Sequence, residues 1–213
     1  MASKNVVITG AAKGIGKACV EYFINNGDRV IALDKDSEAL ALLDPSSGRL
    51  HTLTCDVSKI KLVEEAISTG IQIVGEIDIL VNNAGIQRYS TVTDTTEEEW
   101  DMVMNVNLKS AFLCAKFAIP SMLKKGKGVV INVSSAQAFL SQERVAPYTT
   151  AKTAMLGLTR SIAVDYAPNI RCIAVCPGTV DTPMLHDALN DMENPGKVYQ
   201  ECIDMHLVKR ICQ

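Results

Sequence analysis

Hydrophobic positions along the chain fall into short β-branched runs separated by longer amphipathic stretches. The runs are too short for stable helices, and most lack the alternation of a half-buried strand, so we expect strands that are buried on both faces of a sheet. The expected strands are 5–9, 29–33, 51–54, 78–81, 128–134 and 170–175. The stretches between them predict helices at 14–26, 36–43, 58–74, 97–125 and 147–166.

The alternation of strands and helices predicts the fold class. Strand–helix units joined by right-handed crossovers form a parallel sheet with helices on both faces. No linker rich in serine, glycine or proline divides the chain, so we expect residues 1–213 to form a single domain of the α/β class with one doubly wound (Rossmann) sheet. Three expected helices carry start signals, which are Ser58, the glutamates after Thr96, and Pro147.

Composition narrows the classes of function. Of the 213 residues, 47% are hydrophobic and 21% are charged, and the net charge is -3. These values are typical of a globular domain, and no apolar run suggests a membrane span, so we expect neither nucleic acid nor a membrane as partner. Seven dispersed cysteines without a CxxC pair, and an N-terminus without a signal peptide, predict reduced thiols and a cytoplasmic location.

The spacing of histidines and cysteines indicates no metal site. The three histidines are scattered, without HxxxH or HExxH spacing. Cys172 and Cys176 lie four residues apart and would share one face of a strand. A metal or redox pair is one interpretation, but a buried hydrophobic role is better supported. We therefore expect the protein to use no metal.

A glycine-rich turn follows the first expected strand. Residues 9–16 read TGAAKGIG and lead directly into the first expected helix. The backbone N–H groups of such a turn and the positive end of the helix attract a pyrophosphate, although a tight strand-to-helix turn could need the same glycines. The predicted cofactor contacts here are Gly10, Lys13, Gly14, Ile15 and Gly16.

An acidic residue ends the second expected strand. Asp34 follows Gly16 by eighteen residues, where a carboxylate can accept both hydroxyls of an adenosine ribose and repel a 2′-phosphate. We therefore predict NAD as the cofactor. Lys13 and Lys35 could offset the repulsion, so NADP is also possible.

Two further strand ends carry candidate cofactor contacts. Asp56 and Val57 follow the third strand, where they could lie beside the adenine or form a capping turn before the next helix. Asn83, in the segment NNAG, ends the fourth strand, where small residues leave room for a ligand. Its side chain could equally satisfy exposed backbone groups.

Tyr148 and Lys152 lie four residues apart, on one face of an expected helix. A phenol is a poor base near neutral pH, and a nearby ammonium stabilises the phenolate and lowers its pKa. Such a pair alone is ordinary on a helix surface. Ser135, thirteen residues upstream at the end of the fifth strand, can add a hydroxyl to the same cleft, although Ser134 could exchange roles with it. The three side chains predict an acid–base unit without a metal.

These motifs together resemble the short-chain dehydrogenase/reductase family. TGAAKGIG matches the family's TGxxxGxG loop, NNAG is identical to its motif, and Ser135, Tyr148 and Lys152 match its catalytic serine and YxxxK. The resemblance implies a fourth catalytic residue, Asn107, which would hold a water in a proton relay to the lysine.

The resemblance also implies the reaction and the remaining contacts. It implies hydride transfer between a nicotinamide and a secondary alcohol or carbonyl, with Tyr148 as the proton carrier, Ser135 bonded to the substrate, and Lys152 on the nicotinamide ribose. Tyr148 and Lys152 would thus both contact the cofactor. Val180 and Thr182, after the PG motif, would lie near the nicotinamide. Family members commonly form homodimers or homotetramers, here through helices 97–125 and 147–166.

Polar residues near the expected site favour a hydroxyl-rich small molecule as substrate. They are Gln87 after NNAG, Gln137 after Ser135, and Gln142, Glu143 and Arg144 before the catalytic helix, although the last two could be plain solvated loop. FAIPSM and NVSSAQA are similar to segments of the family's aldose dehydrogenase branch. We expect an aldose or polyol, with a short hydroxy acid or a 3-oxoacyl compound as the alternative.

The chain departs from the family pattern after residues 206–211. Family members continue through another helix and a seventh strand, so we expect a sheet without the family's last strand and weaker turnover. The alternative function is a cofactor-binding or assembly protein with little turnover.

Overall fold

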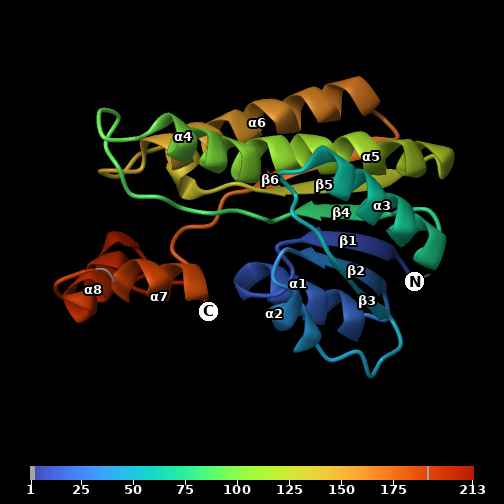
Figure 1. The fold of residues 1–213 in the computed structure, drawn as a ribbon, viewed down its shortest axis with the longest axis horizontal. Helices are drawn as coiled ribbons and strands as arrows, with labels where there is room; N and C mark the ends of the chain where they lie inside the picture. The colour runs from blue at the N-terminus through green and yellow to red at the C-terminus, as the bar shows by residue number, and fades with distance from the viewer. Residues whose placement is uncertain (1–2, 191) are drawn as a thin grey trace.

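A computed structural model describes residues 3–190 and 192–213 (Figure 1). The described residues form a six-stranded parallel sheet in the order β3-β2-β1-β4-β5-β6. The strands are β1 (Asn5–Thr9), β2 (Arg29–Asp34), β3 (Leu50–Thr54), β4 (Ile79–Asn82), β5 (Gly128–Val133) and β6 (Ile170–Val175). The predicted doubly wound α/β fold is confirmed.

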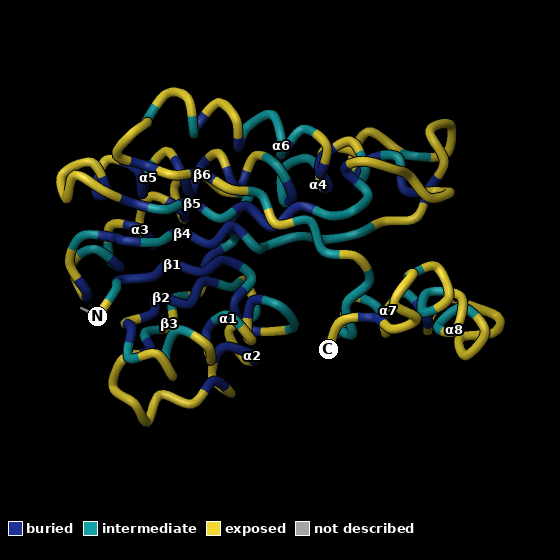
Figure 2. Tube along the Cα trace, turned by 180° about the vertical axis from the view of Figure 1, so that it is seen from behind, coloured by how far each residue is buried: buried dark blue, intermediate teal, exposed yellow. Residues whose placement is uncertain are grey.

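Helices cover both faces of this sheet (Figure 1). One face packs against α3 (Ile60–Val74), α5 (Ser110–Lys124) and α6 (Ala146–Tyr166), and the other against α1 (Gly14–Asn25) and α2 (Ser37–Ala41). Two hydrophobic cores result, one on each side. The central strands are therefore buried on both faces, which explains their uninterrupted apolar sequences (Figure 2).

Strand β6 differs from the central strands because it lies at an edge of the sheet. Within the described residues it pairs with β5 alone. Its residues alternate in burial, and the side chains of Ile173 and Val175 are 48% and 45% exposed. The face that carries α1 and α2 is thus less covered at β6 than at β1.

The expected helix 97–125 consists of three segments. Thr96 caps α4 (Glu97–Met104) by accepting a hydrogen bond from the Glu99 N–H (3.2 Å), as the sequence predicted. A π-helical turn, η1 (Asn105–Lys109), then joins α4 to α5. Contrary to our expectation, the 28-residue run is long and apolar enough for a membrane span, but 50% of its most apolar stretch is buried inside the protein. That burial is typical of a core helix.

The predicted start of α3 was wrong, whereas that of α6 was close. The Ser58 N–H and hydroxyl both donate to the Asp56 carboxylate (2.9 and 2.7 Å), so Ser58 belongs to a preceding turn and the helix begins at Ile60. Pro147 lies in the first turn of α6, as predicted.

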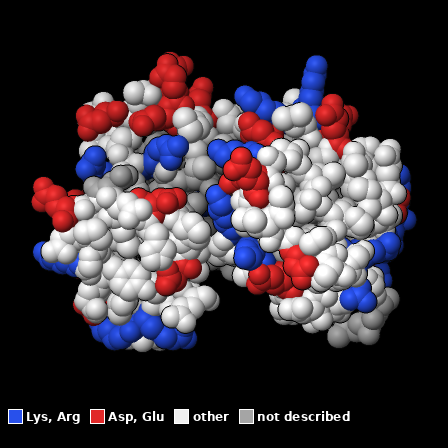
Figure 3. Space-filling view, turned by 60° about the horizontal axis from the view of Figure 1, so that its bottom comes forward, with Lys and Arg blue, Asp and Glu red and all other residues white. Residues whose placement is uncertain are grey.

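A small lobe lies beyond the carboxyl ends of the strands. It contains α7 (Pro183–Asn190) and α8 (Pro195–Met205), which the sequence analysis did not predict (Figure 1). The chain then returns to the segment after β6, where Val180 pairs with Cys212. Figure 3 shows a face that is hollowed between this lobe and the rest of the molecule, with side chains of both charges interspersed over it.

Candidate active site

The candidate residues gather where the strand order reverses. Strand β1 lies between β2 and β4, and the chain builds outward from it in both directions. In such sheets ligands bind in the crevice at the carboxyl ends of the strands beside this reversal. The segments that follow β1, β2, β4, β5 and β6 therefore meet at one edge, together with the lobe.

The glycine-rich turn after β1 is shaped by close backbone contacts. Gly10 and Gly14 have φ angles of +61° and +52°, which favour glycine. A Cβ on Gly16 would overlap the carbonyl oxygen of Gly10, and one on Gly10 would lie 2.8 Å from the Ala84 Cα. Among the described residues, none caps the start of α1 with its side chain. The turn and the helix start thus form a cradle that fits the pyrophosphate of a dinucleotide.

Asn83 holds this cradle against the end of β4. Its side-chain amide donates to the carbonyl oxygens of Thr9 (3.1 Å) and Gly10 (3.0 Å), and its N–H donates to the Thr9 hydroxyl (3.0 Å). The structure therefore gives Asn83 the backbone-satisfying role that the sequence left open. Its predicted direct contact with the cofactor stays a prediction.

The Asp34 carboxylate is fixed at the end of β2. It accepts hydrogen bonds from the N–H groups of Ala12 (3.0 Å) and Asp36 (3.1 Å). Beside it, Lys13 Nζ lies 2.7 Å from the Asp36 carboxylate. Hydrogen bonding to Asp36 raises the pKa of Lys13, so the ammonium is engaged with Asp36.

Asp56 belongs to a turn rather than pointing freely into the crevice. Burial raises the pKa of Asp56, but the two hydrogen bonds from Ser58 lower it by more than burial raises it. The pKa of Asp56 therefore lies below the ordinary value. Val57 is buried. The structure thus shows the local turn that the sequence offered as an alternative, and adenine contact by either residue stays a prediction.

Ser135, Tyr148 and Lys152 come together between β5 and α6. The hydroxyl of Ser135 lies close enough to Tyr148 to lower the pKa of the phenol, and it accepts the Gln137 N–H (3.1 Å). Ser134 instead donates to the Lys152 carbonyl (2.8 Å), which ties α6 to the strand end. The structure therefore places Ser135, and not Ser134, beside the phenol.

Among the described residues, Lys152 does not lower the pKa of Tyr148 as we expected. Lys152 Nζ donates to the Val133 carbonyl (2.8 Å) and lies 5.6 Å from the centre of the Tyr148 ring. Burial raises the pKa of Tyr148, and the Ser135 hydroxyl acts in the opposite direction. Burial also lowers the pKa of Lys152 to about 8. The predicted lowering of the Tyr148 pKa was wrong here because loss of hydration dominates.

Asn107 lies in the π-helical turn and is fully buried. Its amide group donates to the carbonyls of Ile86 (2.9 Å) and Val103 (3.0 Å), and its oxygen accepts the Ile86 N–H (3.1 Å). A Cβ on Gly85 would lie 2.7 Å from Asn107 Oδ1 and 3.5 Å from Lys152 Nζ. Asn107 and Lys152 therefore both lie close to Gly85. The predicted water-holding role of Asn107 stays a prediction.

Val180 and Thr182 lie on the other side of the glycine-rich turn. The Thr182 hydroxyl donates to the Val180 carbonyl (3.3 Å). A Cβ on Gly14 would lie 3.2 Å from the Thr182 methyl group. The segment after β6 is thus in contact with the cradle, as a nicotinamide-side wall would be.

The expected substrate residues occupy different positions. Gln137 is half-buried, and its amide donates to the Gln142 side chain (2.8 Å). Gln87 is also half-buried, and its carbonyl accepts a hydrogen bond from Arg88 (2.9 Å). Substrate contact by Gln137 or Gln87 stays a prediction.

The sequence analysis missed two residues in this region. Burial raises the pKa of Tyr89, and Cys202 and Tyr148 raise it further, so each of these two side chains lies within electrostatic range of Tyr89. Tyr89 follows β4, and Cys202 lies on α8. No spacing rule could have brought Cys202 to this site, because α8 itself was not predicted.

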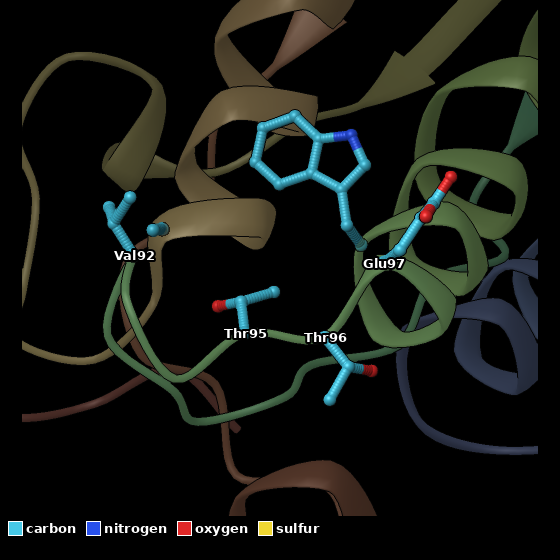
Figure 4. A pocket seen from close by; sticks show the side chains of 6 residues that line it. Val92, Thr95, Thr96 and Glu97 are labelled. Carbon is cyan, nitrogen blue, oxygen red and sulfur yellow. The ribbon is translucent and has the colours of Figure 1, made fainter.

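Two shallow pockets lie beside the site, between the loop after β4 and the start of α6. Figure 4 shows the smaller, of about 300 Å³, which is lined by Val92, Thr95, Thr96, Glu97, Trp100 and Ala146. The larger, of about 560 Å³, is lined by residues 90–92 and 141–146. Gln142, Glu143 and Arg144 thus line a neighbouring pocket.

The cysteines are free thiols, and all seven fall within the described residues. Cys172 is buried, and burial raises its pKa to about 11, whereas Cys176 follows β6 and lies near Lys152. This favours the hydrophobic interpretation of Cys172. Residues 3–190 and 192–213 contain no group of three or more potential metal ligands, and a metal-free reaction stays a prediction.

The fold and the cradle define a dinucleotide-binding α/β protein, and the Ser135–Tyr148 pair beside them adds an acid–base group. Residues 4–193 match the family model described as short chain dehydrogenase. The chain belongs to this family of oxidoreductases, whose members use NAD(P)(H).

Several known proteins are similar to the chain. An uncharacterized oxidoreductase of Thermotoga maritima is 38% identical, over 98% of this chain and 84% of its own length. The ligand-free aldohexose dehydrogenase of Thermoplasma acidophilum is 37% identical, with a TM-score of 0.88, over 99% of this chain and 82% of its own. A variant of actinorhodin polyketide ketoreductase with NADPH is 27% identical, with a TM-score of 0.92, over 99% of this chain and 85% of its own.

We predict that Gly16→Ala weakens NADH binding about tenfold or more, because the new Cβ displaces the Gly10 carbonyl and deforms the cradle. The matched control is Gly157→Ala in α6, whose nearest neighbouring atom would be 4.0 Å away. The control should leave NADH affinity unchanged and raise the free energy of unfolding by about 0.5–1 kcal/mol. Fluorescence titration and chemical unfolding measure the two effects. Unchanged NADH affinity in Gly16→Ala would contradict the cradle assignment.

Proposed function

We propose that the protein is an NAD(H)-dependent dehydrogenase that oxidises a hydroxyl-bearing carbon of an aldose or related polyol. The observation that carries the proposal is the placement of Ser135 next to Tyr148 at the carboxyl end of β5, beside the glycine-rich cradle. It supplies a proton carrier at the edge of the sheet where a dinucleotide would lie.

Each side chain of the site has a separate role in the proposed reaction. Tyr148 takes the proton of the substrate hydroxyl, while Ser135 hydrogen-bonds the same oxygen and orients it. Bound nicotinamide supplies the hydride acceptor. Lys152, whose pKa burial lowers to about 8, lies with its Nζ 5.6 Å from the centre of the Tyr148 ring and would bind the nicotinamide ribose. Asn107, held by Ile86 and Val103, would hold a water in a proton relay to Lys152.

Two observations support an aldose as substrate. Gln137 and Gln142 bring amide groups next to the Ser135 side of the site, and amides bind hydroxyl groups well. The similar protein of Thermoplasma acidophilum is an aldohexose dehydrogenase. A 3-oxoacyl substrate is the second candidate, because Phe139 and Leu140 are 73% and 63% exposed beside these glutamines and would suit an apolar chain.

Steady-state kinetics with NAD(H) tests the substrate class. We expect kcat/KM for at least one aldohexose to exceed that for 3-hydroxybutyrate and for a 3-oxoacyl thioester by about tenfold or more. Ser135→Ala is the control for background turnover. A preference for the thioester would favour the second candidate, and no turnover of any compound would contradict a dehydrogenase acting on these classes.

We predict that Tyr148→Phe lowers kcat/KM by roughly 100-fold to 10,000-fold, because it removes only the proton-carrying hydroxyl. NADH affinity, measured by fluorescence, should stay within about twofold, since the ring and Lys152 remain in place. Tyr22→Phe, at a 64% exposed position on α1, controls for loss of a phenol elsewhere. Retention of a tenth of wild-type activity in Tyr148→Phe would count against the assignment.

We predict that NADH binds about tenfold or more tightly than NADPH. The Asp34 carboxylate would repel a 2′-phosphate, and the nearby Lys13 ammonium is paired with Asp36. Asp34→Asn should reduce the difference between the NADH and NADPH affinities, whereas Asp44→Asn, in an exposed loop, should leave that difference unchanged. Competitive binding measurements decide the point, and tighter binding of NADPH to the wild type would overturn it.

We also propose a homodimer or homotetramer formed through α5 and α6. Phe112 on α5 and Val164 on α6 are 48% and 77% exposed, which favours burial against a second copy. Sedimentation at micromolar concentration should show a dimer or larger, and Phe112→Glu should dissociate it. Leu42→Glu, after α2 on the other face, is the control. A monomeric wild type would refute the proposal.

A further inference from the structure

The imidazole of His206 joins two backbone groups at the end of α8. Its Nε2 accepts the N–H of Thr179 at 3.1 Å, and its Nδ1 lies 2.7 Å from the carbonyl oxygen of Cys202. His206 therefore connects the lobe to the segment that follows β6.

These partners determine the protonation state of the ring. A nitrogen that accepts a hydrogen bond from a backbone N–H carries no proton of its own. The proton must then reside on Nδ1, where it is donated to the Cys202 carbonyl. His206 thus acts as a neutral imidazole with one donor and one acceptor, both used.

The ring also packs directly on the backbone of Gly178. A Cβ at this position would lie 2.5 Å from Nε2 and 3.2 Å from Cδ2 of His206. Any side chain larger than hydrogen would push the imidazole away. Gly178 therefore provides the space in which the hydrogen bond to Thr179 can form.

Cys212 holds the same segment by a second set of hydrogen bonds. Its N–H donates to the Thr179 carbonyl (3.1 Å), and its carbonyl accepts the Asp181 N–H (2.8 Å). Both polar backbone groups of Thr179 are therefore bonded to the end of the chain. The segment leads directly to Thr182, which contacts Gly14 in the cradle.

We propose that His206 is a positioning residue for the nicotinamide half of the cofactor. Neutral His206 holds residues 179–182 by accepting the Thr179 N–H, so that this segment forms the wall between the lobe and the glycine-rich cradle. The proposal rests on the proposed function, in which this segment borders the nicotinamide. His206 acts through the backbone of Thr179 and itself touches neither substrate nor cofactor.

The experiment compares the binding of NADH with that of ADP-ribose, which lacks the nicotinamide ring. Calorimetry on the full chain measures both affinities. His206→Leu should weaken NADH binding about fivefold or more while ADP-ribose binding changes by less than about twofold, because one hydrogen bond that positions only the nicotinamide side is lost. A residue that merely stabilises the fold would weaken both ligands together.

Two further variants sharpen the comparison. His206→Gln keeps an acceptor that can reach the Thr179 N–H, and it should restore most of the NADH affinity. Gln200→Leu is the matched control in the same lobe, because the Gln200 amide bonds the Asp204 side chain within α8 (3.4 Å) and not residues 179–182. It should leave both affinities within about twofold of the wild type.

Three results would overturn the proposal. They are unchanged NADH affinity in His206→Leu, an equal loss of NADH and ADP-ribose affinity, and an equal effect of Gln200→Leu. Because the readout is binding, failure of the wild type to oxidise an aldose would contradict the proposed substrate and leave this comparison intact. A wild type that binds neither ligand would contradict both.

Discussion

The close approach of two strand ends is the constraint on which the site depends. The turn after β1 can lie against the end of β4 only because Gly10 and Gly16 lack side chains, and Asn83 then bonds the carbonyls that this approach buries. With the turn so fixed, the first turn of α1 points into the crevice. The same edge receives Ser135 from β5 and Thr182 from the segment after β6. Cradle, acid–base pair and nicotinamide-side wall thus share one geometric origin.

Buried apolar strands made most of the fold predictable. Strands β1 and β6 begin and end where the hydrophobic pattern placed them, at 5–9 and 170–175, because a sheet covered on both faces selects β-branched runs directly. The start of α3 was missed because Ser58 donates two hydrogen bonds to the Asp56 side chain and so belongs to the turn before the helix. The lobe was missed because α8 has no buried residue and packs against neither core, and burial in a core is what our sequence criteria detect.

The sequence predicted which residues form the candidate site better than it predicted the contacts that these residues make. Spacing along α6 placed Tyr148 and Lys152 together, yet only the folded chain distinguishes Ser134, which donates to α6, from Ser135, which lies beside the phenol. The direction of the Tyr148 pKa was likewise beyond the sequence, since it depends on how much water the surrounding elements exclude. Tyr89 and Cys202 come within electrostatic range of each other from elements far apart in the chain.

The double attachment of Thr179 has a thermodynamic consequence for the lobe. Local opening at the end of α8 breaks the hydrogen bond that the Thr179 N–H donates to His206, and it thereby loosens the segment that contacts the cradle. A ligand that binds only the closed arrangement must, by reciprocity, reduce the population of the open one. Amide hydrogen exchange in residues 183–190 and 192–205 therefore reports whether a crevice formed by other parts of the chain is occupied.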